Sequence, residues 1–443
     1  MKTLEKKYGL WTAIAMVVGV VIGSGVFFKA DDVLALTKGN LILALLAWII
    51  GAISMIFGSL VFAEFAQRIE KANGIVDYSE EAYGEKFGYM VGWFKGIVYY
   101  TPLSAIVAWV AALYTLVLFG SQNPDNSPMT WILAIIYLVA GYALNYYSPI
   151  LSGKFQVTTT VVKLIPLALV AIVGSISGLS NGIMVENFSN AAKSIGSGTG
   201  TLASAVVATA FAYEGWIAAT TINNEIKDAK KNLPKALVIG AIVVFTVYIT
   251  YFLGISGSLA TGTIVAEGNN AISMAANSLF GSTAGVILTA FVVVSCLGTL
   301  NGLVISSIRT LFSLAIRNHG PAPKLLGKVN TKSDMPPYTT IYAFLVTIVY
   351  GVIWYGSLNN WFGQYIGLDE IPIVLIYGLY IFLYVWYMKK FTDLNKWRRF
   401  GIPSFAIIGS LIIVYGGVSN PSIGIYLIIS IALILLGLVF YRK

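Results

Sequence analysis

Two apolar stretches of this sequence are interrupted by glycine, at residues 22–27 (Ile-Gly-Ser-Gly-Val-Phe) and 211–216 (Phe-Ala-Tyr-Glu-Gly-Trp). Each stretch would otherwise be an ordinary membrane-spanning helix. A break in such a helix frees backbone N–H and C=O groups that hydrocarbon cannot satisfy, so it persists only inside protein or beside a cavity. Two breaks at corresponding positions in the halves of one chain are typical of the binding site of a secondary transporter. We therefore expect a membrane transporter with its ligand site at the two breaks.

The composition also indicates a membrane protein. Hydrophobic residues make up 57% of the chain and charged residues 11%, and the mean hydropathy is +0.80. In soluble domains roughly a quarter of the residues are charged. Apolar runs long enough to cross a bilayer recur along the whole chain. The sequence predicts an all-α protein with a single transmembrane domain (1–443) of twelve helices, near 10–36, 41–67, 88–119, 130–147, 153–178, 200–222, 236–260, 282–316, 338–356, 366–388, 402–417 and 421–441.

The placement of the basic residues predicts the orientation of the chain. Nearly all of the 28 lysines and arginines fall in the tails, loops and helix ends of one side, and Lys95 is assigned to that side at the inner end of the third span. Lys29, Lys38 and Lys193 fall on the other side, and Lys163 lies inside a span. This asymmetry follows the positive-inside rule. We expect a multi-pass protein of the plasma membrane with both termini in the cytoplasm. The net charge of +9 follows from this placement of basic residues and does not indicate nucleic-acid binding.

The positions of the two breaks predict an inverted repeat. They fall in the first and sixth predicted spans, so five spans separate equivalent points. Because five is odd, the second half crosses the membrane in the opposite sense. We expect repeats at about 10–178 and 200–388, followed by two further helices at 402–441. This expectation depends on span count and break position, since the two halves share no visible residue pattern.

The first break favours binding of a carboxylate. Gly23 and Gly25 leave helical geometry at little cost, and Ser24 adds a hydroxyl. Freed N–H groups at the start of the following half-helix lie at the positive end of its dipole and can bind an anion. The alternative is close helix packing of the GxxxG kind, for which Gly19 and Gly23 have the spacing.

The second break supplies groups for an ammonium. Backbone carbonyls at the end of the half-helix before Gly215 suit a positively charged ligand, and Phe211 could cover it, although aromatic residues in membrane helices usually serve packing. Glu214 is an ionisable group inside the membrane and therefore a functional candidate. It could pair with a cation, carry a proton or cap the broken helix, and the residues leave these roles open.

Lys163 is the other candidate inside a span. An ammonium near the bilayer midplane costs at least ~2.5 kcal/mol, so it needs acceptors, and carbonyls released by the first break are a natural source. Lys154 lies nine residues earlier and can extend to the membrane surface. We expect Glu64 and Glu225 to form ion pairs at the inner surface. The sequence shows no metal-ligand cluster, phosphate loop or catalytic triad, so we expect no enzyme, no cofactor and no metal site.

Several motifs resemble those of the amino acid–polyamine–organocation (APC) superfamily. They are the two glycine breaks, Lys163-Leu164-Ile165-Pro166, Ala63-Glu64, Asn224-Glu225-Ile226-Lys227 before Leu233-Pro234, and residues 297–302 (Leu-Gly-Thr-Leu-Asn-Gly). Within it, the chain is most similar to L-amino acid transporter (LAT)-type exchangers, close to bacterial serine/threonine or alanine/serine exchangers. The resemblance covers nearly the whole chain in order. It implies the LeuT fold and sodium-independent exchange of small neutral L-amino acids by alternating access.

The resemblance also implies roles for individual residues. Gly23, Ser24 and Gly25 match the loop that binds the substrate carboxylate, and Ile22 beside them is assigned to the substrate-binding site. Phe211 matches the gating aromatic residue, and Ala212 and Gly215 match the carbonyl-lined amine site. Lys163 matches a lysine that resembles a built-in replacement for the second sodium ion of sodium-coupled relatives.

The chain departs from that family in two places. Animal members join a heavy subunit through a cysteine in the loop between helices three and four, and here the loop (121–128) has none, so we expect no disulfide-linked subunit. Members for large neutral substrates have glycine where this chain has Glu214, and the bacterial serine/threonine exchanger has an acid.

Two alternatives to sodium-independent exchange stay open. A proton-coupled symporter in which Glu214 or Lys163 titrates is the first alternative, and a membrane amino acid sensor is the second.

Overall fold

The computed structural model describes residues 4–23, 25–69, 71–121, 123–125, 127–198, 202–268, 270–363, 366–368, 370–418 and 423–442. Within these ranges the chain is almost entirely helical. Pairing of extended backbone there is limited to two isolated bridges, Tyr8 with Ile226 and Asn330 with Met335. The prediction of an all-α protein is confirmed.

In its described residues, the first half of the chain has ten α-helices and two π-helical segments. They are α1 (Leu10–Val21), α2 (Gly25–Leu36), α3 (Leu41–Arg68), α4 (Gly74–Tyr83), α5 (Glu85–Trp93), η1 (Phe94–Tyr100), α6 (Thr101–Leu118), α7 (Pro128–Tyr147), α8 (Pro149–Leu169), η2 (Val170–Gly174), α9 (Ser175–Ser180) and α10 (Ile183–Gly198).

The second half begins with a helix that changes to 3₁₀ geometry. Its elements are α11 (Leu202–Ala212), η4 (Trp216–Glu225), α12 (Ala229–Ser258), α13 (Thr261–Glu267), α14 (Asn270–Phe280), α15 (Ala284–Ile316), α16 (Pro323–Leu326), α17 (Pro337–Leu358), α18 (Glu370–Lys390), η5 (Trp397–Gly401), α19 (Ile402–Val418) and α20 (Ile423–Leu438).

Nine helices in the described part of the chain are long and apolar enough to cross a membrane. They match the predicted spans two to five and seven to eleven. The other three predicted spans correspond to the α1–α2 pair, to α11 with η4, and to the shorter α20. The outer faces of α7 and α17 carry exposed apolar side chains, among them Ile132, Ile136, Ile341 and Leu345. An uncovered apolar surface of this extent fits contact with lipid.

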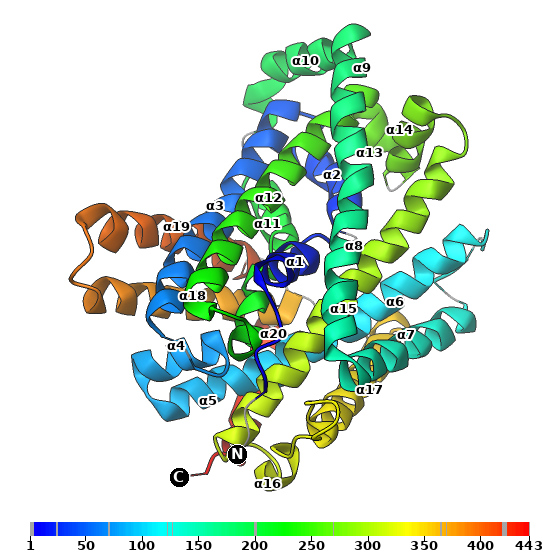
Figure 1. The fold of residues 1–443 in the computed structure, drawn as a ribbon. Helices are drawn as coiled ribbons and strands as arrows, with labels where there is room; N and C mark the ends of the chain where they lie inside the picture. Colours follow the sequence, from blue (N-terminus) through cyan, green and yellow to red (C-terminus); the bar gives the residue numbers. More distant parts are fainter. Residues whose placement is uncertain are drawn as a thin grey trace.

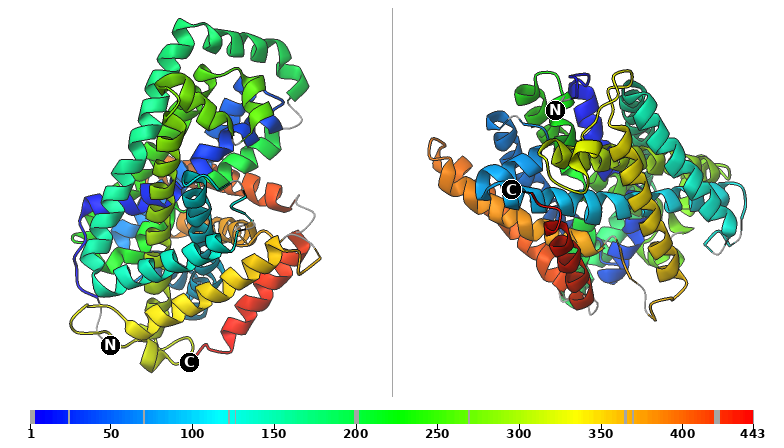
Figure 2. Two further views of the ribbon diagram at one scale, coloured as in Figure 1. Left: turned by 90° about the vertical axis from the view of Figure 1, so that its right-hand side faces the viewer. Right: turned by 90° about the horizontal axis from the view of Figure 1, so that it is seen from below.

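The broken helices lie inside the bundle. Helix α1 packs against α8, α12 and α15, and α11 packs against α2 and α3. Helices α9 and α10 lie at one end of the molecule, whereas α16 and both chain ends lie at the other (Figures 1 and 2). The long helices thus surround two short ones whose interrupted ends are shielded from the outer surface.

Buried charges connect three segments at the end of the molecule that holds the termini. Glu225 is 1% exposed. Its carboxylate accepts hydrogen bonds from Arg309 Nε of α15 at 2.8 Å and lies 3.2 Å from the ammonium of Lys7. Its backbone carbonyl accepts from the N–H groups of Lys7 and Tyr8, each at 2.9 Å. Glu64 pairs with Arg68 and Arg398 in the same way, at 2.8 and 2.7 Å. The ion pairs predicted for both glutamates are confirmed.

Helix α4 is fixed to the end of α15 by a further pair, between Asp77 and Arg317. Arg317 Nε also lies 3.1 Å from Glu80, and the Asp77 carboxylate accepts the backbone N–H of Asn73 at 2.8 Å. Burial raises the pKa of Asp77 to about 7, against the opposing charge of Arg317. Because a neutral aspartic acid attracts Arg317 less, this connection weakens when the pH falls below about 7.

Replacing Glu225 by Gln tests the buried network. The substitution leaves the buried Arg309 guanidinium without its counter-charge, a change that typically costs about 3–5 kcal/mol. We expect a clearly lower thermal unfolding temperature of the purified protein in detergent. The matched control is Asp32→Asn, which breaks an exposed pair with Lys29 at 2.8 Å that is worth about 0–1 kcal/mol. Equal unfolding temperatures for the two variants would contradict a stabilising role for the network.

Candidate functional site

The first helix breaks between Val21 and Gly25. Ile22 is completely buried and has left helical geometry, with φ −77° and ψ 87°. The N–H of Gly23 bends back to the carbonyl of Val21 at 2.9 Å. Ser24, predicted to bind the substrate, lies outside the described residues. Gly25 begins α2, and among the described atoms no heavy atom lies within 4 Å of the position that a β-carbon would take there.

The second break follows α11. Ala212 is the last residue of α11, and Gly215 precedes η4 with φ +104°, a left-handed conformation that favours glycine. A β-carbon on Gly215 would lie 2.9 Å from Val20 Cγ1 of α1, so the two broken helices are in close contact here. The backbone of Phe211 belongs to α11, and its side chain lies outside the described part of the structure.

Lys163 connects α8 to the first break. Its side chain is fully buried, and its ammonium donates to the carbonyls of Gly19 at 2.9 Å and Ile22 at 2.5 Å. Gly19 lies in the last turn of α1 and Ile22 directly follows that helix, so the break removes the helical donors of both carbonyls. The expectation that carbonyls of the first helix satisfy Lys163 is confirmed at the level of contacts, and Lys154 is exposed as expected.

Helix α15 completes this cluster with groups that the sequence analysis did not identify. The carbonyl of Ser295 accepts from Lys163 at 3.1 Å, and the Thr299 hydroxyl lies 3.4 Å from the same ammonium. The Ser295 hydroxyl donates to the carbonyls of Ile22 and Gly23, both at 3.2 Å. Three elements, α1, α8 and α15, are therefore held together through the ammonium of one lysine.

A single hydroxyl joins the two breaks. Tyr248 of α12 is buried, and its hydroxyl lies 3.0 Å from the carbonyl of Val21 and 3.0 Å from that of Ala212. The carbonyl of Ala212, predicted to face a substrate amine, thus already has one protein donor and retains one lone pair. Nothing in the sequence distinguishes Tyr248, a tyrosine within an apolar span, as the residue that joins the two breaks.

Glu214 lies between Ala212 and Gly215 and is 9% exposed. Its carboxylate accepts a hydrogen bond from the Tyr99 hydroxyl of η1 at 2.6 Å. Lys95, assigned by the sequence analysis to the cytoplasmic end of the third span, is instead completely buried beside Tyr99. That assignment is wrong. The helix begins at Glu85, and Lys95 lies ten residues further on, about 15 Å along the axis from its start.

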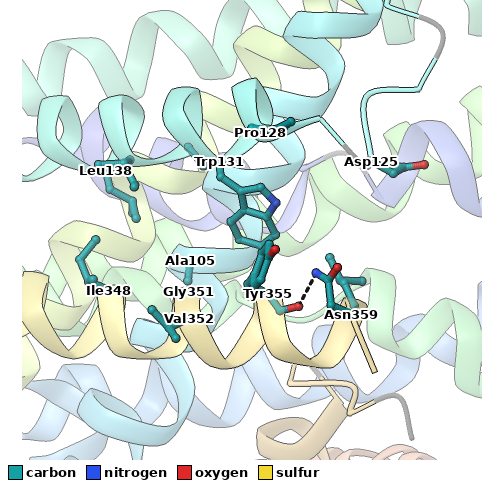
Figure 3. Close-up of a pocket in the computed structure, with 13 residues that line it drawn as sticks. Ala105, Asp125, Pro128, Trp131, Leu138, Ile348, Gly351, Val352, Tyr355 and Asn359 are labelled. Carbon is teal, nitrogen blue, oxygen red and sulfur yellow. Dashed lines mark hydrogen bonds between the residues drawn. The ribbon is translucent and has the colours of Figure 1, made fainter. Parts of the chain in front are cut away.

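A cavity of about 390 Å³ lies elsewhere, between α6, α7 and α17 (Figure 3). Trp131 and Tyr355 meet edge to face in its wall, with ring centroids 5.1 Å apart. Its lining includes the exposed side chains of Ile135 and Val352. It therefore opens on the apolar outer surface, and none of its lining residues belongs to either break.

A helical membrane protein whose two broken helices meet beside a buried lysine has the architecture of a secondary transporter. The chain belongs to the amino acid permease family, whose model matches residues 8–441. It is 31% identical to the serine/threonine exchanger SteT of Bacillus subtilis (strain 168), over 97% of this chain and 95% of that protein. It is 27% identical to the b(0,+)-type amino acid transporter 1 of Mus musculus, over 99% of this chain and 88% of that protein. A third relative, large neutral amino acids transporter small subunit 2 of Mus musculus, is 28% identical over 78% of this chain and 64% of its own length.

Lys163→Ala tests the connection between α8 and the first break. The substitution leaves the carbonyls of Gly19 and Ile22 with fewer donors, at ~1–3 kcal/mol for each unsatisfied group. Because Lys163 contacts the broken helix and is not assigned a ligand contact, we expect the transport rate to fall more than substrate affinity. Lys154→Ala is the control and should transport at the normal rate. Equal losses of binding and turnover in Lys163→Ala would contradict the assigned role.

Gly25→Val tests whether the start of α2 borders the ligand. No described heavy atom lies within 4 Å of the position of a β-carbon at Gly25, so we expect the variant to fold. We expect the valine to block access of a carboxylate to the freed N–H groups and to abolish amino acid binding, measured as loss of the ligand-induced rise in unfolding temperature. Wild-type affinity in a folded Gly25→Val variant would place the ligand elsewhere.

Proposed function

We propose that the chain exchanges small neutral L-amino acids across the membrane by alternating access, without sodium. The observation that carries this proposal is the ammonium of Lys163, which lies among oxygen atoms of Gly19, Ile22, Ser295 and Thr299. Unwound carbonyls of this kind coordinate the coupling ion in sodium-driven transporters. A covalently attached ammonium supplies the positive charge from the chain itself, so the site needs no sodium ion to balance those carbonyls.

The two breaks supply complementary ends for an α-amino acid. We infer that the N–H groups at Ser24 and Gly25 bind the carboxylate, because Gly25 begins α2 at the positive end of its dipole. The carbonyls of Ala212 and Gly215 are assigned to the ammonium, with the remaining lone pair of the Ala212 carbonyl available to it. Phe211 is assigned to the gate that covers the ligand.

The substrate class is inferred from relatives and from charge. The Bacillus subtilis relative is named as an exchanger of serine and threonine, two amino acids with small neutral side chains. We infer the same substrate class for this chain. Lys95 packs on the ring of Tyr99, whose hydroxyl donates to Glu214, so we infer that a basic and an acidic group balance each other beside the second break. Both observations support small, uncharged substrates.

A proton-coupled symporter of the same fold is the second candidate. The observation that favours it is the burial of Lys163 and Glu214, two groups that can gain or lose a proton inside the membrane. An amino acid sensor has less support, because the loops between spans are too short to form a signalling domain.

The setting of the protein is also proposed. We place it in the plasma membrane with both termini in the cytoplasm, following the basic residues. We propose that it works without a disulfide-linked subunit, because Cys296, the single cysteine in the sequence, is buried within α15. The inverted repeats at 10–178 and 200–388, with the added helices at 402–441, stay a prediction.

Uptake into proteoliposomes tests exchange directly. We expect labelled serine and alanine to enter vesicles that are preloaded with serine and to stay out of empty ones, because exchange needs an internal partner. Replacing sodium by choline should leave the rate unchanged. Accumulation in empty vesicles driven by sodium would refute the proposal, and accumulation driven by an inward proton gradient would favour the symporter.

A further inference from the structure

A second lysine is buried in the bundle, away from the first break. Lys95 lies in η1, is 0% exposed, and its ammonium has no hydrogen-bond acceptor among the described residues. It packs on aromatic rings instead, 3.3 Å from the centroid of Tyr99 and 4.6 Å from that of Tyr100. Cation–π contacts stabilise a buried ammonium. They leave its full charge in place, and a buried charge without a counter-charge is costly.

The counter-charge comes from the second break. The Tyr99 hydroxyl donates to Glu214 at 2.6 Å, so the ring under the ammonium of Lys95 also holds the carboxylate. The π-helical geometry of η1 contributes to this arrangement, because its i to i+5 repeat places both Tyr99 and Tyr100 beside Lys95.

Glu214 also borders the site assigned to the ligand. It stands between Ala212, whose carbonyl shares the Tyr248 hydroxyl with the first break, and Gly215, which packs on α1. A carboxylate beside a ligand is the natural partner of an ammonium or guanidinium group. In this chain Lys95 already supplies that cation from within the protein.

We propose that Lys95 is a specificity-determining residue. Its positive charge, held against the ring of Tyr99, balances the negative charge of Glu214, so that the site accepts uncharged side chains and rejects cationic ones. The inference rests on the proposed exchange of neutral amino acids. With both residues present, the region has no net charge, and a cationic side chain meets the repulsion of Lys95. Without Lys95, Glu214 presents an unbalanced negative charge, and a cationic side chain can take the place of the lost ammonium.

Lys95→Met tests this, because methionine keeps an unbranched side chain and removes the charge. Serine uptake into serine-loaded proteoliposomes is measured with 2,4-diaminobutyrate, ornithine and lysine as competitors. We expect the concentration of at least one diamino acid needed for half-inhibition to fall by about tenfold, equivalent to ~1.4 kcal/mol. That diamino acid, when labelled, should itself be exchanged. Lys154→Met, at an exposed position of α8, and Lys95→Arg, which keeps the charge, should both continue to reject the diamino acids.

The double variant Lys95→Met with Glu214→Gln separates charge from packing. It removes both charges, so the gained binding of diamino acids should disappear. If Lys95→Met alone does not fold, Glu214→Gln is tested instead. Its unbalanced ammonium should admit aspartate as a competitor. If neither single variant folds while the double variant does, the pair has a purely structural role and the proposal is overturned.

The result that overturns the specificity role is a folded Lys95→Met variant that exchanges serine and still rejects every diamino acid. In that case the wild-type protein, measured in the same vesicles, would retain neutral exchange and the proposed function would stand. Failure of the wild-type protein to exchange serine or alanine would instead remove the proposed function, and the specificity role with it.

Discussion

The unpaired carbonyls at the end of α1 are the constraint on which the rest of the structure depends. Inside a membrane they must find donors in the protein, and Lys163 together with Ser295 and Thr299 supplies them. The buried ammonium in turn requires those oxygens, so neither partner is stable there without the other. This mutual need fixes α8 and α15 against α1. It also explains Gly19, where a β-carbon would lie 2.4 Å from the side chains of Gln156 and Thr160 of α8.

Features that are costly in a membrane were predictable from the sequence. A glycine pair or a charge inside an apolar run carries an energetic penalty, so the two breaks, Lys163 and the ion pairs of Glu64 and Glu225 could all be inferred from local rules. The membrane-spanning class follows from hydropathy in the same way. Gly19 packs closely against a neighbouring helix, as the alternative of helix packing predicts for it. The ligand roles of Gly23 and Gly25 stay predictions.

The partners of these residues could not be predicted. Thr299 lies 136 residues from Lys163. It belongs to the motif at 297–302, but hydroxyl side chains are common in membrane helices, so the motif does not indicate a contact with Lys163. Tyr248 is one of 26 tyrosines in the chain. Lys95 was misplaced because the positive-inside rule assigns a basic residue by its distance from the end of a span. It carries no information about a π-helical segment, in which a lysine can turn inward onto two aromatic rings.

The hydroxyl of Tyr248 has a consequence for motion between the two halves of the site. It carries one proton and faces two carbonyls at the same distance of 3.0 Å, those of Val21 and Ala212. A small displacement of either carbonyl therefore transfers the hydrogen bond wholly to the other one. The two broken helices can separate while α12 keeps one full hydrogen bond throughout, so this part of the protein offers little enthalpic resistance to a conformational change.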